Sequence, residues 1–347
     1  MRSDSKYQRE IELATRPTTP HEQLQIQKQA GFSYRMAIGE LIYALVVARL
    51  DISFAVIKLS QYSANPAIPH YQAIRHVFAY LNNTRNEGLT YWRRTPRHDL
   101  PDIPPSPPRS SFTNQLERPI ATSPQAILTY SDSDWGSDAS HRRSVTGVVI
   151  LLAGAAVVYL TQYQKAIALS STEAEFVAAS EAGKRTIYLR TILTDLGFSN
   201  DNPTQLLIDN TGAVFMVDAG APTKRTRHVD IRYFALLEWS ESGQLKAEPI
   251  PTDANISDSM TKATGRIKFH QHADLYMGRT PPPYVPATSL SSLQSHQIST
   301  FHLIPVPLDT LSALHHPIIS AFTIHSTDLL EATEHGRVRG YSRPVLL

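Results

Sequence analysis

The chain has 347 residues, enough for two modest domains with connecting segments. It contains no cysteine, which excludes a disulfide scaffold and a thiolate zinc site, and we expect an intracellular protein, cytoplasmic or nuclear and not secreted. No run of about 18 consecutive apolar residues occurs, so the sequence predicts no membrane partner. The net charge is +2, but residues 1–100 carry +5 and residues 125–265 carry −4. The net negative charge of residues 125–265 excludes a generic basic DNA-binding domain. It fits a metal-dependent site in which bound cations neutralise clustered carboxylates.

The first third of the chain predicts helices and then a linker. Residues 1–30 are polar and predict an irregular segment. Residues 31–94 predict a helical segment. Its apolar residues recur with helical spacing from 32 to 81, and residues 88–92 predict a short strand. Residues 95–125 are rich in Pro, Ser and Arg, a composition that buries no core and predicts an extended linker.

A second compact region is expected at residues 126–275. Its first strand is predicted at 126–135, and a hairpin follows from two apolar runs around Ala153-Gly154-Ala155. Residues 165–169 resemble a further strand, and the hydroxyls of Ser170, Ser171 and Thr172 are suitable N-caps for a helix that reaches about Leu196. The remaining elements are expected in the order strand 205–209, helices 210–219 and 225–241, strand 245–250 and a last helix from about Ser257. This order predicts an α/β fold, a mixed sheet flanked by helices. Residues 280–347 predict a disordered tail.

Two of four candidate metal-binding acids lie in the first strand and the first long helix. Asp132 and Asp134 are two apart, so both side chains point to one face of a strand, near the end where mixed sheets bind ligands. A solvated strand face is the alternative. In the helix, Glu175 shares a stripe with alanines and leucines, whereas Glu173 and Glu181 lie off it. A carboxylate on the apolar stripe is costly unless a charged partner is present.

The other two candidates are Asp209 and Asp258. Asp209 ends an apolar strand, where an Asx-type helix cap is an equal alternative, and Asp258 begins the last helix, where acids are common. The four acids together predict one metal site at one edge of the sheet, as two-metal phosphodiester chemistry requires. A basic cluster is a candidate for phosphate contacts, with a solvated helix face as its alternative: Lys224, Arg225, Arg227 and His228.

Six short motifs, in this order, resemble the ribonuclease H domain of Copia-type LTR retrotransposon Pol polyproteins. They lie at 130–135 (YSDSDW), 143–147 (RSVTG), 168–176 (ALSSTEAEF), 208–210 (IDN), 225–233 (RTRHVDIRY) and 258–262 (DSMTK). Residues 32–92 resemble the segment just upstream in those polyproteins, so the helical segment is interpreted as a C-terminal remnant (thumb or connection) of reverse transcriptase.

The resemblance implies a ribonuclease H-like fold with a five-stranded mixed sheet, preceded here by the small helical segment. It implies cleavage of the RNA strand of RNA–DNA hybrids with two Mg²⁺ ions, Mn²⁺ being an alternative. Asp132, Glu175, Asp209 and Asp258 match the family's four metal-binding acids. At the first position it is the resemblance, and not the spacing, that selects Asp132 over Asp134.

The chain departs from the family in ways that define a second hypothesis. It has no Asp-Asp dipeptide, so we expect no polymerase site in it. Residues 95–125 are longer than the family's usual connection, and 280–347 match no part of it. These departures predict, as the alternative to an active nuclease, a truncated and non-catalytic retrotransposon remnant that folds and at most binds nucleic acid.

Overall fold

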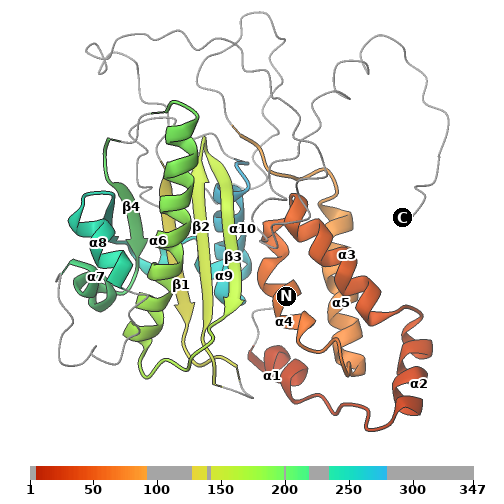
Figure 1. Ribbon diagram of the computed structural model, residues 1–347. Coiled ribbons are helices and arrows are strands. Elements are labelled where there is room, and N and C mark those ends of the chain that lie inside the picture. The colour runs from red at the N-terminus through yellow and green to blue at the C-terminus, as the bar shows by residue number, and fades with distance from the viewer. Residues whose placement is uncertain (1–4, 92–126, 139–141, 199–200, 219–233, 280–347) are drawn as a thin grey trace, which may run out of the picture. The chain divides into compact units, whose positions relative to one another are not determined.

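A mixed sheet organises the second half of the chain in the computed structural model, which describes residues 5–91, 127–138, 142–198, 201–218 and 234–279. The five-stranded sheet has the order β3-β2-β1-β4-β5 (Figure 1). Its strands are β1 (Leu128–Asp134), β2 (Val145–Leu152), β3 (Ala155–Tyr163), β4 (Thr204–Ile208) and β5 (Leu245–Pro249). β2 is antiparallel to β1 and β3, whereas β1, β4 and β5 are parallel. This topology confirms the expected ribonuclease H-like fold.

The two faces of the sheet pack against different helices. Along β1, Leu128 and Tyr130 belong to one hydrophobic core, while Ile127 belongs to another and Thr129 bonds to Thr186 of a helix at 2.8 Å. This alternation is the period-two pattern of a strand that is buried on both sides. One face is covered by α6 (Ser171–Asp195), α7 (Thr211–Asp218) and α8 (Phe234–Glu241), and the other by α9 (Asp258–Thr261) and α10 (Arg266–Tyr276).

The predicted hairpin is confirmed, but the further strand at 165–169 is wrong. Ala153 and Gly154 both adopt positive φ, 52° and 83°, as a tight two-residue hairpin turn requires. The pairing of β3 with β2 ends where Tyr163 faces Val145. Gln164 N–H still donates to the carbonyl of Ser144, the residue before β2, and after this bond the chain turns into α6 instead.

The predicted last helix is two helices. α9 ends at Thr261, the backbone of the following Lys262 is extended (φ −144°, ψ 160°), and α10 begins after Gly265. The 3₁₀ turn η3 (Thr252–Ala254) precedes α9. Of the helix expected at 225–241, α8 is the described part, and 225–233 lie outside the described residues.

The N-terminal segment is more helical than its composition predicts. It forms α1 (Ser5–Leu13), α2 (Pro20–Ala30), α3 (Tyr34–Val47), η1 (Leu50–Ile52), α4 (Ser53–Ser60) and α5 (Ile68–Asn83). The prediction of an irregular 1–30 is wrong because Thr19 and Glu22 form a capping box, Pro20 starts α2 and Gly31 ends it at φ 79°. The predicted strand 88–92 is absent over its described residues 88–91, since Thr90 N–H donates to the carbonyl of Met277, at the end of a helix.

The helical segment packs on the sheet. One hydrophobic core contains Leu41, Leu59 and Ile74 of the helices together with Tyr130 and Val149 of the sheet. Polar contacts join the same parts: Tyr159 O–H of β3 donates to the carbonyls of Leu45 (2.7 Å) and Val46 (3.0 Å), and Ser53 Oγ lies 2.7 Å from Thr161 Oγ1. All described residues belong to one compact unit, 1–294. The domain boundaries stay predictions.

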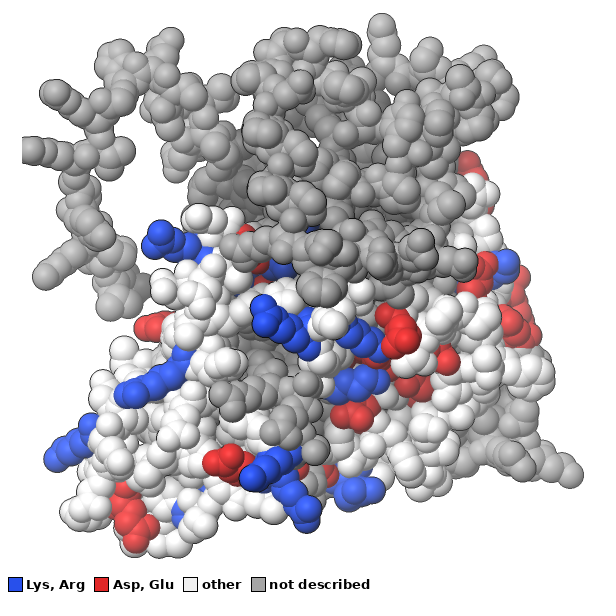
Figure 2. Space-filling view, turned by 180° about the vertical axis from the view of Figure 1, so that it is seen from behind, with Lys and Arg blue, Asp and Glu red and all other residues white. Residues whose placement is uncertain are grey.

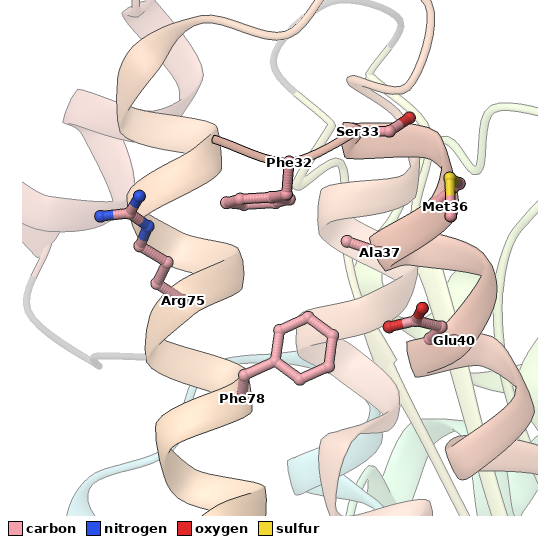
Figure 3. A pocket seen from close by; sticks show the side chains of 7 residues that line it. All are labelled: Phe32, Ser33, Met36, Ala37, Glu40, Arg75 and Phe78. Carbon is pink, nitrogen blue, oxygen red and sulfur yellow. The ribbon is translucent and has the colours of Figure 1, made fainter. Parts of the chain in front are cut away.

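The surface of the helical segment has a pocket of about 290 Å³ between α3 and α5 (Figure 3). Met36 and Glu40 line it from α3, and Arg75 and Phe78 from α5; none of the four candidate acids does. Among the described residues no single helix is long and apolar enough to cross a membrane. α2 and α3, bent by 59° against each other, meet the length and composition criteria only as a pair.

Candidate active site

The parallel register of β1 and β4 brings two of the candidate acids together. Ser131 of β1 pairs with Ile208 of β4, so the next residues along the two strands, Asp132 and Asp209, lie side by side at the carboxyl ends of the strands. Ligands of mixed α/β sheets bind at this edge. Asp132 is buried (1% exposed) and Asp209 is half-buried. Asn210, and not Asp209, caps α7, because its Oδ1 accepts from Ala213 N–H at 3.0 Å.

Glu175 is the third acid, and α6 carries it to the same edge. Ser170 caps this helix by accepting from Glu173 N–H at 3.1 Å, and the carboxylate of the half-buried Glu173 accepts from Leu169 N–H. Two residues further, Glu175 is 6% exposed, and its Oε1 accepts from Ser133 N–H of β1 at 3.1 Å. Its buried Oε2 has no hydrogen-bond partner among the described residues. Helical phase therefore separates Glu175 from Glu173 as expected.

Asp132, Glu175 and Asp209 form the acidic triad. Each offers one carboxylate oxygen, and the three oxygens lie within 4.8 Å of one another. Three converging carboxylates suit a hard divalent cation. Asp134, half-buried at the end of β1, is not a member of the triad. The predicted basic cluster at Lys224, Arg225, Arg227 and His228 lies outside the described residues.

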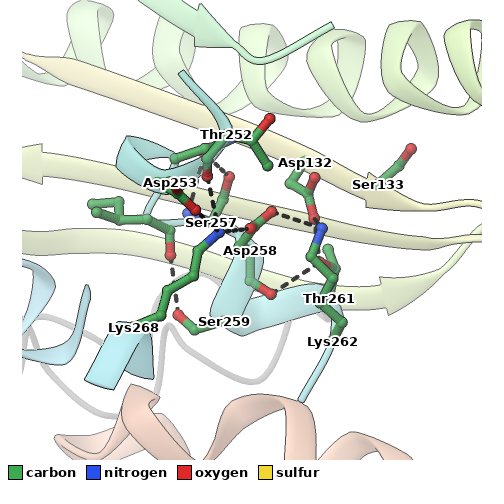
Figure 4. A network of polar contacts seen from close by, with 12 residues as sticks. Asp132, Ser133, Thr252, Asp253, Ser257, Asp258, Ser259, Thr261, Lys262 and Lys268 are labelled. Atoms are coloured by element: carbon green, nitrogen blue, oxygen red, sulfur yellow. Dashed lines mark hydrogen bonds and ion pairs between the residues drawn. The ribbon is translucent and has the colours of Figure 1, made fainter. Parts of the chain in front are cut away.

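The fourth acid, Asp258, is buried at the start of α9 and is held by two lysines (Figure 4). Its Oδ1 lies 2.8 Å from Lys262 Nζ, and its Oδ2 lies 2.6 Å from Lys268 Nζ. Lys262 Nζ also lies 3.7 Å from Asp132 Oδ2, to which Thr261 O–H donates a short hydrogen bond. The structure thus brings three of the four acids together as possible ligands and places the fourth beside them in an ion-pair network.

Gly147 allows this close approach of α9. It faces Asp132 in the β1–β2 register. A Cβ at this position would lie 2.6 Å from Thr261 Cγ2 and 2.9 Å from both Met260 Cβ and Ser257 O. Sequence reasoning missed Gly147, Lys262 and Lys268. Asp258 and Lys262 are four residues apart, a spacing at which two oppositely charged side chains on a helix form an ion pair, so this contact could have been predicted.

The charges of the triad raise the pKa values of its members. Burial, together with the negative charges of Asp132 and Asp209, raises the pKa of Glu175 to about 9. Burial raises the pKa of Asp132 to about 7 against the opposing effect of Lys262. The pKa of Asp209 is raised by burial and by Asp258. For Asp258, burial is outweighed by Lys262 and Lys268, and its pKa is lowered.

These shifts predict a stability that depends on pH and on divalent cations. Asp132 and Glu175 have folded-state pKa values above their ordinary values of 3.8 and 4.5, so their protonated forms favour folding. In EDTA, the free energy of unfolding should fall as the pH rises from about 4 to about 9, by about 2 kcal/mol or more in total. Millimolar Mg²⁺ should remove most of this loss, because it binds the ionised carboxylates of the folded chain.

Urea unfolding at a series of pH values checks this prediction. Glu175→Gln should flatten the profile in EDTA, because it removes the group with the most strongly raised pKa. Glu173→Gln is the matched control and should leave the slope unchanged. A wild-type stability that is independent of pH in EDTA, or a slope that Mg²⁺ does not alter, would contradict the electrostatics of the triad.

The sheet order, with converging acids at the carboxyl ends of β1 and β4, defines the chain as a ribonuclease H-like protein. No family model matches the chain. The retrovirus-related Pol polyprotein from transposon TNT 1-94 of Nicotiana tabacum is 30% identical over 253 residues, 73% of this chain and 17% of that protein. Secreted RxLR effector protein 161 of Plasmopara viticola is 32% identical over 156 residues, 45% of this chain and 90% of that one. The solved structure of LC11-RNase H1 is 17% identical and covers 40% of this chain and 93% of its own, with a TM-score of 0.31.

The chain belongs to the retrovirus-related Pol polyproteins of Copia-type transposons. It spans 17% of the tobacco polyprotein and 15% of the RE1 polyprotein of Arabidopsis thaliana. The described residues of the chain form a ribonuclease H-like fold and the helical segment that precedes it.

Proposed function

We propose that the chain is a metal-dependent ribonuclease that cleaves the RNA strand of RNA–DNA hybrids by two-metal hydrolysis. The observation that carries the proposal is the acidic triad, whose three oxygens from β1, α6 and the end of β4 lie within 4.8 Å of one another. Membership of the Pol polyproteins supports the same function.

The triad fits a divalent cation. The buried Oε2 of Glu175 has no hydrogen-bond partner among the described residues, and a carboxylate oxygen in such a place is costly unless a cation or a proton satisfies it. The raised pKa values of the triad have the same cause, negative charge gathered where water is largely excluded. Oxygen ligands favour Mg²⁺, with Mn²⁺ as the alternative.

Each residue has a distinct part in this proposal. Asp132, Glu175 and Asp209 would hold the first cation, and Asp132 with Asp258 the second. The N–H of Ser133 orients Glu175, and the O–H of Thr261 orients Asp132. When bound, two divalent cations at such a site lower the pKa of an attacking water and offset the charge that develops on the leaving oxygen.

The proposed substrate is an RNA–DNA hybrid duplex. The protein would recognise its backbone and the 2′-hydroxyl groups of the RNA strand, without reading the base sequence. On the face drawn in Figure 2, the coloured Lys and Arg side chains are interspersed with Asp and Glu, so the described residues of this face form no broad field of one sign. Cations bound at the acids would therefore add to the attraction of the site for a polyanion. An intracellular location, expected from the composition, is part of the same proposal.

Cleavage of the labelled RNA strand of a hybrid in Mg²⁺ tests the proposal. The full chain should cleave it, and Asp209→Asn should lower the rate by about 10²-fold or more, because one ligand loses its charge. Asp218→Asn is the matched control: Asp218 is exposed at the end of α7 and should be neutral on substitution. A wild-type chain as inert as Asp209→Asn, in both Mg²⁺ and Mn²⁺, would overturn the proposal in favour of a non-catalytic remnant.

A further inference from the structure

Lys262 stands between two of the four acids. Its Nζ lies 2.8 Å from Asp258 Oδ1 and 3.7 Å from Asp132 Oδ2 (Figure 4). The side chains of Asp132 and Asp258 are almost fully buried, whereas that of Lys262 is 39% exposed. An ammonium therefore reaches from the surface into the gap between two buried carboxylates.

The site consequently has two unequal halves. In the acidic triad, Glu175 Oε2 is buried without a partner among the described residues. On the other side, each oxygen of Asp258 lies beside an ammonium: Oδ1 is 2.8 Å from Lys262 Nζ, an ion pair without a hydrogen bond, and Oδ2 accepts a hydrogen bond from Lys268 Nζ at 2.6 Å. Lys268 is itself anchored, since it donates to the carbonyl of Thr252 at 3.0 Å. The triad presents uncompensated negative charge, and the Asp132–Asp258 gap already has a positive group.

We propose that Lys262 and the second divalent cation compete for the Asp132–Asp258 gap, so that the triad binds the first cation tightly and the second binds only when Lys262 moves out. This inference rests on the proposed function and adds an order of binding to it. Two cations within about 4 Å repel each other strongly in a partly buried site, so the gap accepts one of them at a time.

The geometry of Lys262 makes the exchange feasible. The residue follows the last turn of α9 with an extended backbone, and its flexible four-carbon side chain is partly in solvent. It can swing outward without disturbing α9. Lys268 lies in α10 and approaches Asp258 from the other oxygen, so it does not bridge to Asp132. This difference supplies a matched control.

Titration of the full chain with Mn²⁺, followed by the electron paramagnetic resonance signal of the free ion, tests the inference. The wild type should bind one ion, and a second at least about tenfold more weakly. Lys262→Met should tighten the second ion by at least about tenfold and leave the first unchanged. Lys268→Met should have a smaller effect on the second ion. Glu175→Gln should weaken the first.

Two ions of similar affinity in the wild type, or no tightening in Lys262→Met, would overturn the inference. An equal effect of Lys268→Met would also overturn it, because net charge alone would then set the affinity. If Lys262→Met does not fold, the wild-type titration alone still tests whether the two ions bind with unequal affinity. A wild type that binds two equal ions and cleaves hybrids would overturn the competition and keep the proposed function. A wild type that binds no Mn²⁺ would overturn both.

Discussion

Removal of residues 1–91 is expected to unfold the ribonuclease H-like part of the chain. The helical segment and one face of the sheet share a hydrophobic core, in which Leu41, Val56 and Ile74 are completely buried. Each large apolar side chain that deletion exposes on the sheet costs about 1.5–3 kcal/mol, and a few of them exceed the typical 5–15 kcal/mol stability of a domain. Far-UV circular dichroism with urea unfolding measures the effect. A fragment 92–347 that unfolds cooperatively at the wild-type midpoint would contradict the shared core.

A point substitution tests the same junction more finely. Gly278 has φ 69°, and a Cβ there would collide with the carbonyl oxygen of Thr90 in the N-terminal segment. Gly243 has φ 71° and open space around it, so Gly243→Ala reports the backbone strain alone. Gly278→Ala should be less stable than Gly243→Ala by about 2 kcal/mol, the cost of overpacking. Equal losses of stability in the two variants would show that the backbone of Thr90 does not pack against Met277 and Gly278.

Gly147→Ala is expected to abolish most of the nuclease activity. The added Cβ would lie within 3 Å of three atoms of α9 and its N-cap, one of them the backbone carbonyl of Ser257, so the helix has to shift. α9 carries Asp258 and Thr261, both of which face Asp132. A displacement of about 1 Å in such a site costs about 10²-fold in rate. Hybrid cleavage measures the loss.

Gly39→Ala is the matched control for this variant. Gly39 lies within α3, and a Cβ there meets nothing within 4 Å, so the substitution should leave activity intact and slightly favour the helix. A Gly147→Ala protein that folds and cleaves hybrids at the wild-type rate would mean that α9 does not need its close approach to β2.

The acids were predictable because each has a local signal. Asp132 lies near the end of β1 and Asp209 directly follows β4, and parallel strands align their carboxyl ends. Glu175 lies on the apolar stripe of a long helix. The ion pairs of Asp258 had a weaker signal, since the expected last helix breaks at Lys262 and Lys268 comes from the next helix. The docking of the helical segment on the sheet had no signal in the sequence. α3 buries Leu41 and exposes Tyr43, but its periodicity does not show which surface the helix packs against.

The central claim, that four acids on one sheet edge make this chain a hybrid-specific nuclease, is tested most directly by one measurement. The full chain is incubated with Mg²⁺ and either an RNA–DNA hybrid or a DNA duplex of the same sequence, and cleavage of each strand is followed. We expect cleavage of the RNA strand of the hybrid only, and loss of this cleavage in Asp132→Asn. Equal cleavage of the DNA duplex, or cleavage that survives Asp132→Asn, would contradict it.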